Sequence, residues 1–281
     1  MNRASFLVLA AACSVSLWRP AVAMAPRPPL SDPITGPRSA LTKDWIGRQQ
    51  PGLGIPILIL AGHADSQGIA GSGTSGEAVD LLGQAPMDPR MRDELFWNRL
   101  VAIRVVQMGR QQGLNIRYYQ PPLLRIDNAD DPRTNWSVGR RHVRRGGYAL
   151  EVHFDAYGPD GYGSGLIPRL SPGPNRLDEG LAASFGPFPL RFRGGLGGPR
   201  RGISLLEVGK LEGDLERRLR DPRTRESTID AIALRVVTSM RGSLVSGHDP
   251  LAPAPGELSS QRPAARRAPQ DPRPSASPAG V

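Results

Sequence analysis

The stretch YALEVHFDAY (residues 148–157) decides the predicted fold. Apolar and polar residues alternate along it, so the two faces of a strand would carry different side chains. The apolar face would hold Leu150, Val152 and Phe154, and the polar face would hold Glu151, His153 and Asp155. Alternation of this kind predicts a β-strand with one face packed into a core.

Similar signals lie on both sides of this stretch. The runs IPILILA (55–61) and GISLLEVG (202–209) predict two more buried strands, and NIRYY (115–119) predicts a weaker one nearer to an edge. Helical patterns occupy residues 93–112, 137–145, 175–185 and 228–241. Because strands alternate with helices, we predict a single α/β domain built around a mostly parallel sheet.

Composition restricts the chemistry of the chain. Its 281 residues carry a net charge of +10 and include one cysteine and four histidines. A single cysteine excludes an intramolecular disulfide framework and a zinc site made of several thiolates, so a metal site would need carboxylate ligands. Aromatic residues make up only 5% of the chain and are not interleaved with the basic ones, so no nucleic-acid partner is predicted.

The first 23 residues have the pattern of a secretory signal peptide. Arg3 precedes an apolar run over residues 4–18, and Ala21, Val22 and Ala23 supply small residues for cleavage. We therefore expect an exported protein of the periplasm or cell envelope, without stable membrane insertion after cleavage. Cys13 follows three alanines but lacks the usual leucine of a lipoprotein site, which leaves lipidation open.

Proline-rich segments flank the predicted domain. Residues 24–50 have no apolar periodicity and are predicted to be a linker, and the folded domain is expected over residues 51–246. Residues 247–281 are rich in Pro, Ala and Arg and contain no aromatic residue. Such a segment cannot bury enough apolar surface to offset its ordering entropy, so we predict a disordered tail.

Four polar residues lie where a ligand site is expected. In open α/β sheets, ligands bind beyond the carboxyl ends of the strands. His63 follows the first predicted strand, His153 and Glu207 lie near the ends of two others, and Glu94 begins a helix. Two imidazoles and a carboxylate form a familiar catalytic zinc set, while a further carboxylate can manage protons.

Four short motifs carry a resemblance to a known family. They are AGH (61–63), Glu94 placed nineteen residues before Gly113, EVHFD (151–155) and LEVG (206–209). In this order, over about residues 55–240, the chain resembles zinc-dependent N-acetylmuramoyl-L-alanine amidases of the amidase 3 type.

The resemblance implies a function and a set of roles. Zn²⁺ would be held by His63, Glu94 and His153, and Glu207 would act as the general base and acid. The substrate would be peptidoglycan, cleaved at the amide between the lactyl group of N-acetylmuramic acid and L-alanine. The implied fold is a sheet of about six strands with helices on both faces.

The chain departs from the family pattern near the first histidine. Ala64 and Asp65 stand where two glycines are usual, and the separation of His63 from Glu94 is longer than usual. Glu77 therefore competes for the ligand role, although the distance from Glu94 to the end of its helix matches the family better. The extra residues 68–92 predict a Gly/Pro-rich loop that either shapes the substrate groove or restricts access to it.

Further carboxylates and rival functions remain open at this point. Glu151, Asp65 and Asp155 are candidates for contacting the metal ligands, and Glu151 is also a rival for the role of base. One alternative function is another exported zinc peptidase that acts on wall peptides. A second is a non-catalytic wall-binding or regulatory relative, and a regulatory protein partner is possible in either case.

Overall fold

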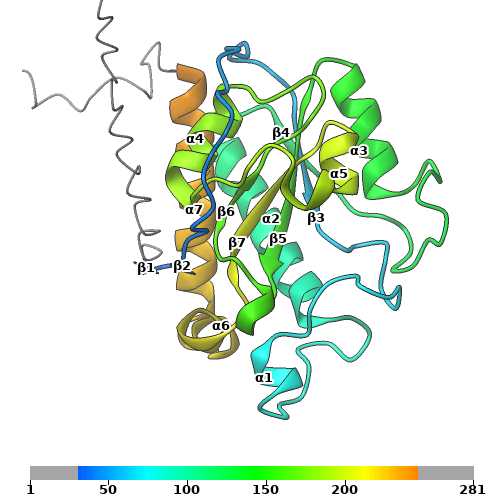
Figure 1. Cartoon of the computed structure of the whole chain (residues 1–281), viewed down its shortest axis with the longest axis vertical. Helices are drawn as coiled ribbons and strands as arrows, with labels where there is room; N and C mark the ends of the chain where they lie inside the picture. The colour runs from blue at the N-terminus through cyan, green and yellow to red at the C-terminus, as the bar shows by residue number, and fades with distance from the viewer. Residues whose placement is uncertain (1–30, 246–281) are drawn as a thin grey trace, which may run out of the picture.

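The computed structural model describes residues 31–245, which form one α/β domain (Figure 1). The predicted signal peptide (1–23), Cys13 and the predicted tail (247–281) lie outside the described residues. Within the described part, no helix is both long and apolar enough to cross a membrane. The predicted α/β class is confirmed.

The main sheet has five strands in the order β4-β3-β5-β7-β6, rather than about six. Their bounds are β3 Ile57–Ala61, β4 Ile116–Tyr119, β5 Tyr148–Asp155, β6 Gly165–Ile167 and β7 Ser204–Lys210. The first four in this order run parallel, and only β6 is antiparallel to its neighbour β7. The predicted mostly parallel sheet is therefore present, with the weak strand β4 at an edge.

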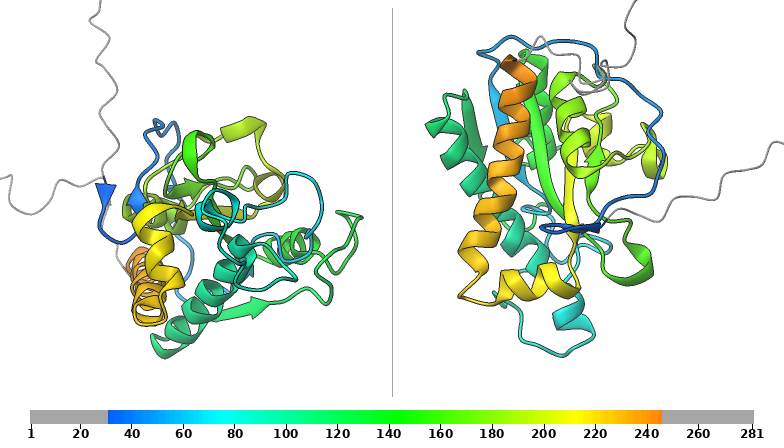
Figure 2. Two further views of the ribbon diagram at one scale, coloured as in Figure 1. Left: turned by 90° about the horizontal axis from the view of Figure 1, so that it is seen from below. Right: turned by 90° about the vertical axis from the view of Figure 1, so that its left-hand side faces the viewer.

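Helices cover both faces of the sheet. One face carries α2 (Asp93–Gln111), α4 (Arg176–Phe185) and α7 (Arg225–Val245), and α7 packs against both α2 and α4 (Figure 2). The other face carries α3 (Asn135–Arg144) and α5 (Gly197–Arg200). The remaining short elements are α1 (Glu77–Asp80), α6 (Gly213–Arg220) and the 3-10 turns η1 (Gly158–Asp160) and η2 (Phe192–Gly194).

The alternation along β5 divides the core between these two layers. Leu150, Val152 and Phe154 are buried in the large cluster beneath α2, α4 and α7. Ala149 lies in a smaller cluster with Leu58, on the side of α3. All residues of β3 and β5 are buried, so these two strands are covered on both faces and not, as the alternation along β5 predicts, on one face only.

Residues 31–50, which the sequence assigns to a linker, are part of the fold. Strands β1 (Ser31–Asp32) and β2 (Gly36–Pro37) pair with each other. Trp45 is buried, and its indole Nε1 donates to the carbonyl of Phe188 at 2.8 Å. A proline-rich segment of this kind has no hydrophobic periodicity, because it packs through single side chains and not through a regular helix or strand. Its place in the fold therefore could not be predicted from the sequence pattern.

The parallel register brings the carboxyl ends of three strands together. His153 of β5 and Glu207 of β7 are direct cross-strand partners, so their side chains leave the same face of the sheet. Strand β3 pairs with the other edge of β5 and ends at Ala61, two residues before His63. The fold therefore places His63, His153 and Glu207 next to one another at three adjacent strands of the sheet.

Candidate metal centre

The backbone between β3 and His63 is shaped by its contact with His153. A Cβ atom on Gly62 would lie 2.3 Å from Cε1 of the His153 imidazole, so only glycine fits there. His63 itself has a positive φ of 62°, a conformation that costs a non-glycine residue about 1–3 kcal/mol. The Gln67 side chain donates to the His63 carbonyl at 2.9 Å and holds this turn. Strained backbone conformations of this kind cluster at functional sites in proteins, which makes the turn at His63 a candidate for one.

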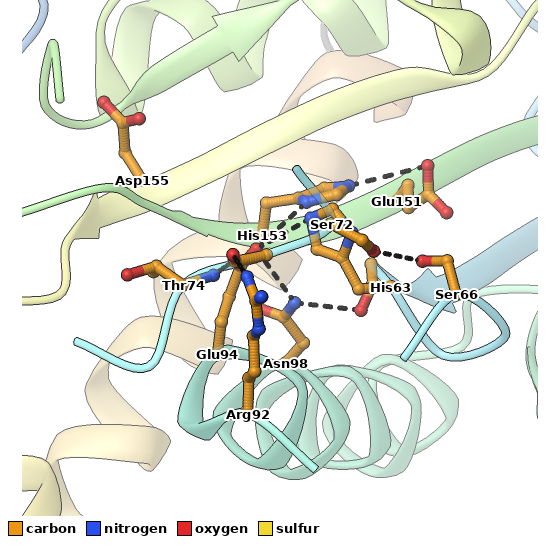
Figure 3. Close-up of polar contacts among 12 residues, drawn as sticks. His63, Ser66, Ser72, Thr74, Arg92, Glu94, Asn98, Glu151, His153 and Asp155 are labelled. Atoms are coloured by element: carbon orange, nitrogen blue, oxygen red, sulfur yellow. Dashed lines mark hydrogen bonds and ion pairs between the residues drawn. The ribbon is translucent and has the colours of Figure 1, made fainter. Parts of the chain in front are cut away.

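His63, Glu94 and His153 converge at the end of the sheet (Figure 3). One ligand atom from each residue lies within 4.8 Å of the others. Glu94 Oε1 is 3.3 Å from His63 Nε2 and 3.2 Å from His153 Nδ1, and the two imidazole rings meet edge to face. The three residues that the sequence analysis selected as ligands are thus in one group.

Glu94 is held in place from two sides. It lies in the first turn of α2 and is buried, and its Oε2 accepts a hydrogen bond from the backbone N–H of Thr74 at 2.8 Å. Asn98, one turn further along α2, donates to Glu94 Oε1 at 3.4 Å and to the carbonyl of Gly62 at 3.1 Å. Burial opposes ionisation of Glu94, but the charges and hydrogen bonds of the two histidines outweigh it and lower the pKa of Glu94 well below its usual range.

Each imidazole turns its other nitrogen to a different partner. His63 Nδ1 lies 2.9 Å from Ser72 Oγ. His153 Nε2 faces Glu151 Oε2 at 3.5 Å, which is longer than a good hydrogen bond but close enough for a strong charge interaction. Burial disfavours the cationic form of His153, yet Glu151 and Glu94 outweigh burial and raise the pKa of His153 well above its usual value. Glu151 in turn accepts from the Asn135 amide at 3.1 Å.

Glu207 stands beside this group without a partner for one of its oxygens. Its Oε2 is inaccessible to solvent and has no hydrogen-bond partner among the described residues. Burial raises the pKa of Glu207 to about 8, and the charges of Asp155 and Glu94 act in the same direction while that of His153 opposes them. A carboxyl oxygen that is shielded from water and lacks a partner is destabilising unless the group has a chemical task.

The other two predicted acids hold loops rather than imidazoles. Asp155 accepts backbone N–H bonds from Ala156 at 2.9 Å and Gly163 at 3.0 Å, and it points away from the histidines (Figure 3). Asp65 accepts from the backbone N–H of Asn135 at 2.6 Å, at the start of α3. Backbone N–H groups occupy carboxylate oxygens of Asp155 and Asp65 that could otherwise have oriented an imidazole. Glu151 differs from them because it faces the imidazole of His153.

Glu77, the rival carboxylate, lies outside the group. It begins α1, and its Oε2 accepts from the backbone N–H of Gly213 at 2.8 Å. It lines a separate cavity of about 210 Å³. The structure therefore places Glu94, and not Glu77, with the two histidines.

Sequence reasoning missed several residues that hold the group together. Ser72 and Thr74 contact it from the inserted segment, and no periodicity or motif marks them. Asn98 follows Glu94 by four residues on a helix, so helical spacing could have found it. Asn135 contacts Glu151 from α3 and carries no sequence signal.

A cavity of about 580 Å³ opens in front of the group. Its walls include the three converging residues, Glu207, Glu151, residues 69–74, Arg193 and residues 196–198. Two imidazole nitrogens and a carboxylate oxygen are a donor set that suits Zn²⁺, and the cavity leaves space for water and substrate on the open side. The residues present therefore fit a catalytic metal ion.

Solved structures that the chain resembles include three N-acetylmuramoyl-L-alanine amidases. The catalytic domain of CwlV from Bacillus (Paenibacillus) polymyxa var. colistinus has 15% identity and a TM-score of 0.45, over 68% of this chain and 98% of that one. Ami1 from Mycobacterium abscessus has 19% identity and a TM-score of 0.43, over 68% and 99%. AmiC2 of Nostoc punctiforme has 14% identity and a TM-score of 0.42, over 67% and 97%.

No protein-family model matches the chain, and no curated protein is significantly similar to it in sequence. A structural likeness at these identities and scores carries no information about activity. The activity must therefore be inferred from the side chains of the cavity.

Proposed function

We propose that this chain is an exported zinc amidase of peptidoglycan. It would cleave the amide between the lactyl group of N-acetylmuramic acid and the L-alanine of the stem peptide, in the periplasm or cell envelope. The observation that carries the proposal is the convergence of His63, Glu94 and His153 beside Glu207 in one cavity. The order of the sequence motifs supports the choice of substrate.

His63 Nε2, His153 Nδ1 and Glu94 Oε1 are the atoms that would hold the ion. Bound zinc supplies a Lewis acid that polarises a carbonyl and lowers the pKa of a bound water to about 7. The charges and hydrogen bonds of the two imidazoles outweigh the opposing effect of burial and lower the pKa of Glu94, so its carboxylate is ionised and able to bind a cation. Nδ1 of His63 lies within hydrogen-bond distance of Ser72 Oγ, and Nε2 of His153 faces Glu151 at 3.5 Å, so each ring has a polar neighbour at its second nitrogen.

Glu207 is the group that would move the proton. It faces the same cavity as the two histidines, and its Oε2 has no partner within residues 31–245 that would have to be displaced. A carboxyl whose pKa lies near the working pH can accept a proton from water and later return it to the leaving L-alanine nitrogen. A cation nearby would lower this pKa and so favour the base form before the reaction.

The products of wall digestion test the proposal. Purified peptidoglycan incubated with the zinc-loaded protein should release stem peptides that begin with a free L-alanine amino group, and glycan strands that keep muramic acid intact. Mass spectrometry with amino-terminal labelling would detect both products. A sample treated with a zinc chelator is the control and should release neither.

Two outcomes would replace the proposed activity. New amino termini inside the stem peptide would assign the site to a wall peptidase. Absence of any product from the zinc-loaded protein, although it binds wall, would assign the chain to a non-catalytic relative.

A further inference from the structure

The inserted segment 68–92 contacts two of the three converging residues directly. Ser72 Oγ lies 2.9 Å from His63 Nδ1, and the backbone N–H of Thr74 donates to Glu94 Oε2 at 2.8 Å. Ser72 is only 7% exposed, so its hydroxyl is sheltered from competition with water. The segment therefore forms a wall of the metal group itself, not only the mouth of the cavity (Figure 3).

The Ser72 hydroxyl is placed to control the protonation of His63. A neutral imidazole carries its proton on one nitrogen only, and a metal binds the nitrogen that lacks it. If Ser72 Oγ accepts a hydrogen bond from Nδ1–H, the lone pair of His63 Nε2 is left facing Glu94 and the metal position. Ser66 Oγ contacts Ser72 Oγ, so the serine hydroxyl also has a partner to which it can donate.

The segment is fixed where Ser72 and Thr74 meet the site. Arg92, just before α2, donates to the carbonyl of Gly73 between them. Gly73 has a positive φ of 76°, and a Cβ atom there would come within 3.1 Å of Glu94 Oε2. The backbone thus approaches the carboxylate so closely that this position needs glycine, and the end of α2 that carries Glu94 also anchors the segment that contacts it.

We propose that the segment 68–92 is a positioning element of the metal centre, in which Ser72 keeps His63 in the tautomer that binds zinc through Nε2. This inference rests on the proposed zinc function and assigns that function a residue outside the sequence motifs. Ser72 acts through His63 and does not itself contact the metal or the substrate. The segment raises the affinity for the metal by holding His63 and Glu94. It does not act as a lid that covers the cavity.

The affinity of the full chain for Zn²⁺ tests the assignment. We expect Ser72→Ala to raise the zinc dissociation constant about 10–100-fold, measured by competition with a chromogenic chelator. Ser137→Ala is the matched control, because Ser137 is a buried serine on α3 whose Oγ has no partner among the described residues. This control and the Ser72→Ala protein should melt close to the wild-type temperature without metal.

A second pair of variants isolates the hydroxyl from its packing. Ser72→Thr keeps the acceptor and Ser72→Val replaces it with a methyl group of the same shape. We expect the threonine variant to keep a zinc dissociation constant within a few fold of wild type, and the valine variant to show the loss seen with alanine. This pair also decides the matter if the alanine variant does not fold.

Distinct results separate the inference from the proposed function. If the wild type binds zinc and both Ser72→Ala and Ser72→Val bind it equally well, the positioning role is overturned and the proposed function stands. If Ser72→Ala weakens zinc binding but also lowers the melting temperature of the metal-free protein by several degrees, the role of Ser72 is structural. The inference is then also overturned. If the wild type binds no zinc, the proposed function fails and the positioning role fails with it.

Discussion

Strand β7 contacts one carboxyl group at its amino end and carries another at its middle residue, and the two groups have opposite surroundings. At the amino end, Asp178 of α4 accepts from the Tyr148 hydroxyl at 2.8 Å and from Ser204 Oγ, while its second oxygen accepts from the backbone N–H of Asn175 at 2.7 Å. Arg169 lies 3.6 Å from that second oxygen. At the middle of the strand, Oε2 of Glu207 has no partner within the described part of the chain.

The difference separates a structural acid from one that is free to react. Every oxygen of Asp178 is satisfied and the group is fully buried, so it joins α4 to the sheet and has no access to a ligand. Glu207 lines the large cavity beside two imidazoles. In the proposed amidase, the unsatisfied oxygen of Glu207 would be available for proton transfer.

Glu207→Gln should have the largest effect, and on activity alone. The amide cannot take a proton from water, so we expect kcat for wall digestion to fall at least about 100-fold. The free energy of unfolding should stay within about 0.5 kcal/mol of wild type, because a neutral group of the same shape replaces a poorly solvated one. Kinetics of digestion and urea denaturation on the same preparation would measure both. A variant that keeps more than a tenth of the activity would contradict the assigned role.

Asp178→Asn should show the reverse pattern. It breaks a buried charge pair with Arg169 and the capping box of α4, so we expect the free energy of unfolding to fall by about 3 kcal/mol. Zinc content and kcat per folded molecule should remain at wild-type values. Urea denaturation with the activity assay below the transition would show this, and a loss of zinc from the folded variant would remove the distinction between Asp178 and Glu207.

Glu216 of α6 sharpens the comparison because it combines features of both acids. One of its oxygens accepts from the backbone N–H of Ala78 at 3.0 Å, and the other has no partner among residues 31–245. Burial raises its pKa to about 7, with help from the charges of Asp93 and Glu77 and against that of Arg220. It lies at the small second cavity, whose lining includes no histidine.

An unsatisfied oxygen without the imidazoles should affect stability and not activity. Because the pKa of Glu216 is higher in the folded state than its ordinary 4.5, the folded state binds the proton more tightly. Its contribution should therefore favour folding below about pH 4.5 and be lost as the pH rises through about 7. The free energy of unfolding of Glu216→Gln should fall by on the order of 1 kcal/mol less than that of wild type over this pH range, and kcat should be unchanged. Denaturation of both proteins across this range would test it, and equal slopes would contradict it.

Much of the fold could be predicted because its strands carry strong local signals. The alternation along β5 and the apolar run of β3 follow directly from which faces are buried. Helix α6 was missed because its sequence GDLERRLR presents only Leu215 and Leu219 as apolar residues, too few for a periodic signal. Strand β6 has three residues, which is too short for alternation to be recognised.

The candidate site divides in the same way. The rule that ligands bind at the carboxyl ends of parallel strands was enough to select His63, His153 and Glu207. The supporting contacts could not be predicted, because they depend on how an irregular segment folds back. Ser72 reaches His63 across nine residues of loop, and nothing local distinguishes it from Ser66.

The zinc content of the purified full-length protein tests the central claim most directly. Elemental analysis after exchange into zinc-containing buffer should find about one zinc ion per chain for wild type and for Glu77→Ala. His63→Ala, Glu94→Ala and His153→Ala should each lose it, because three protein ligands are needed to hold the ion. A wild-type protein without zinc, or a Glu94→Ala protein that keeps its zinc while Glu77→Ala loses it, would contradict the metal centre described for this chain.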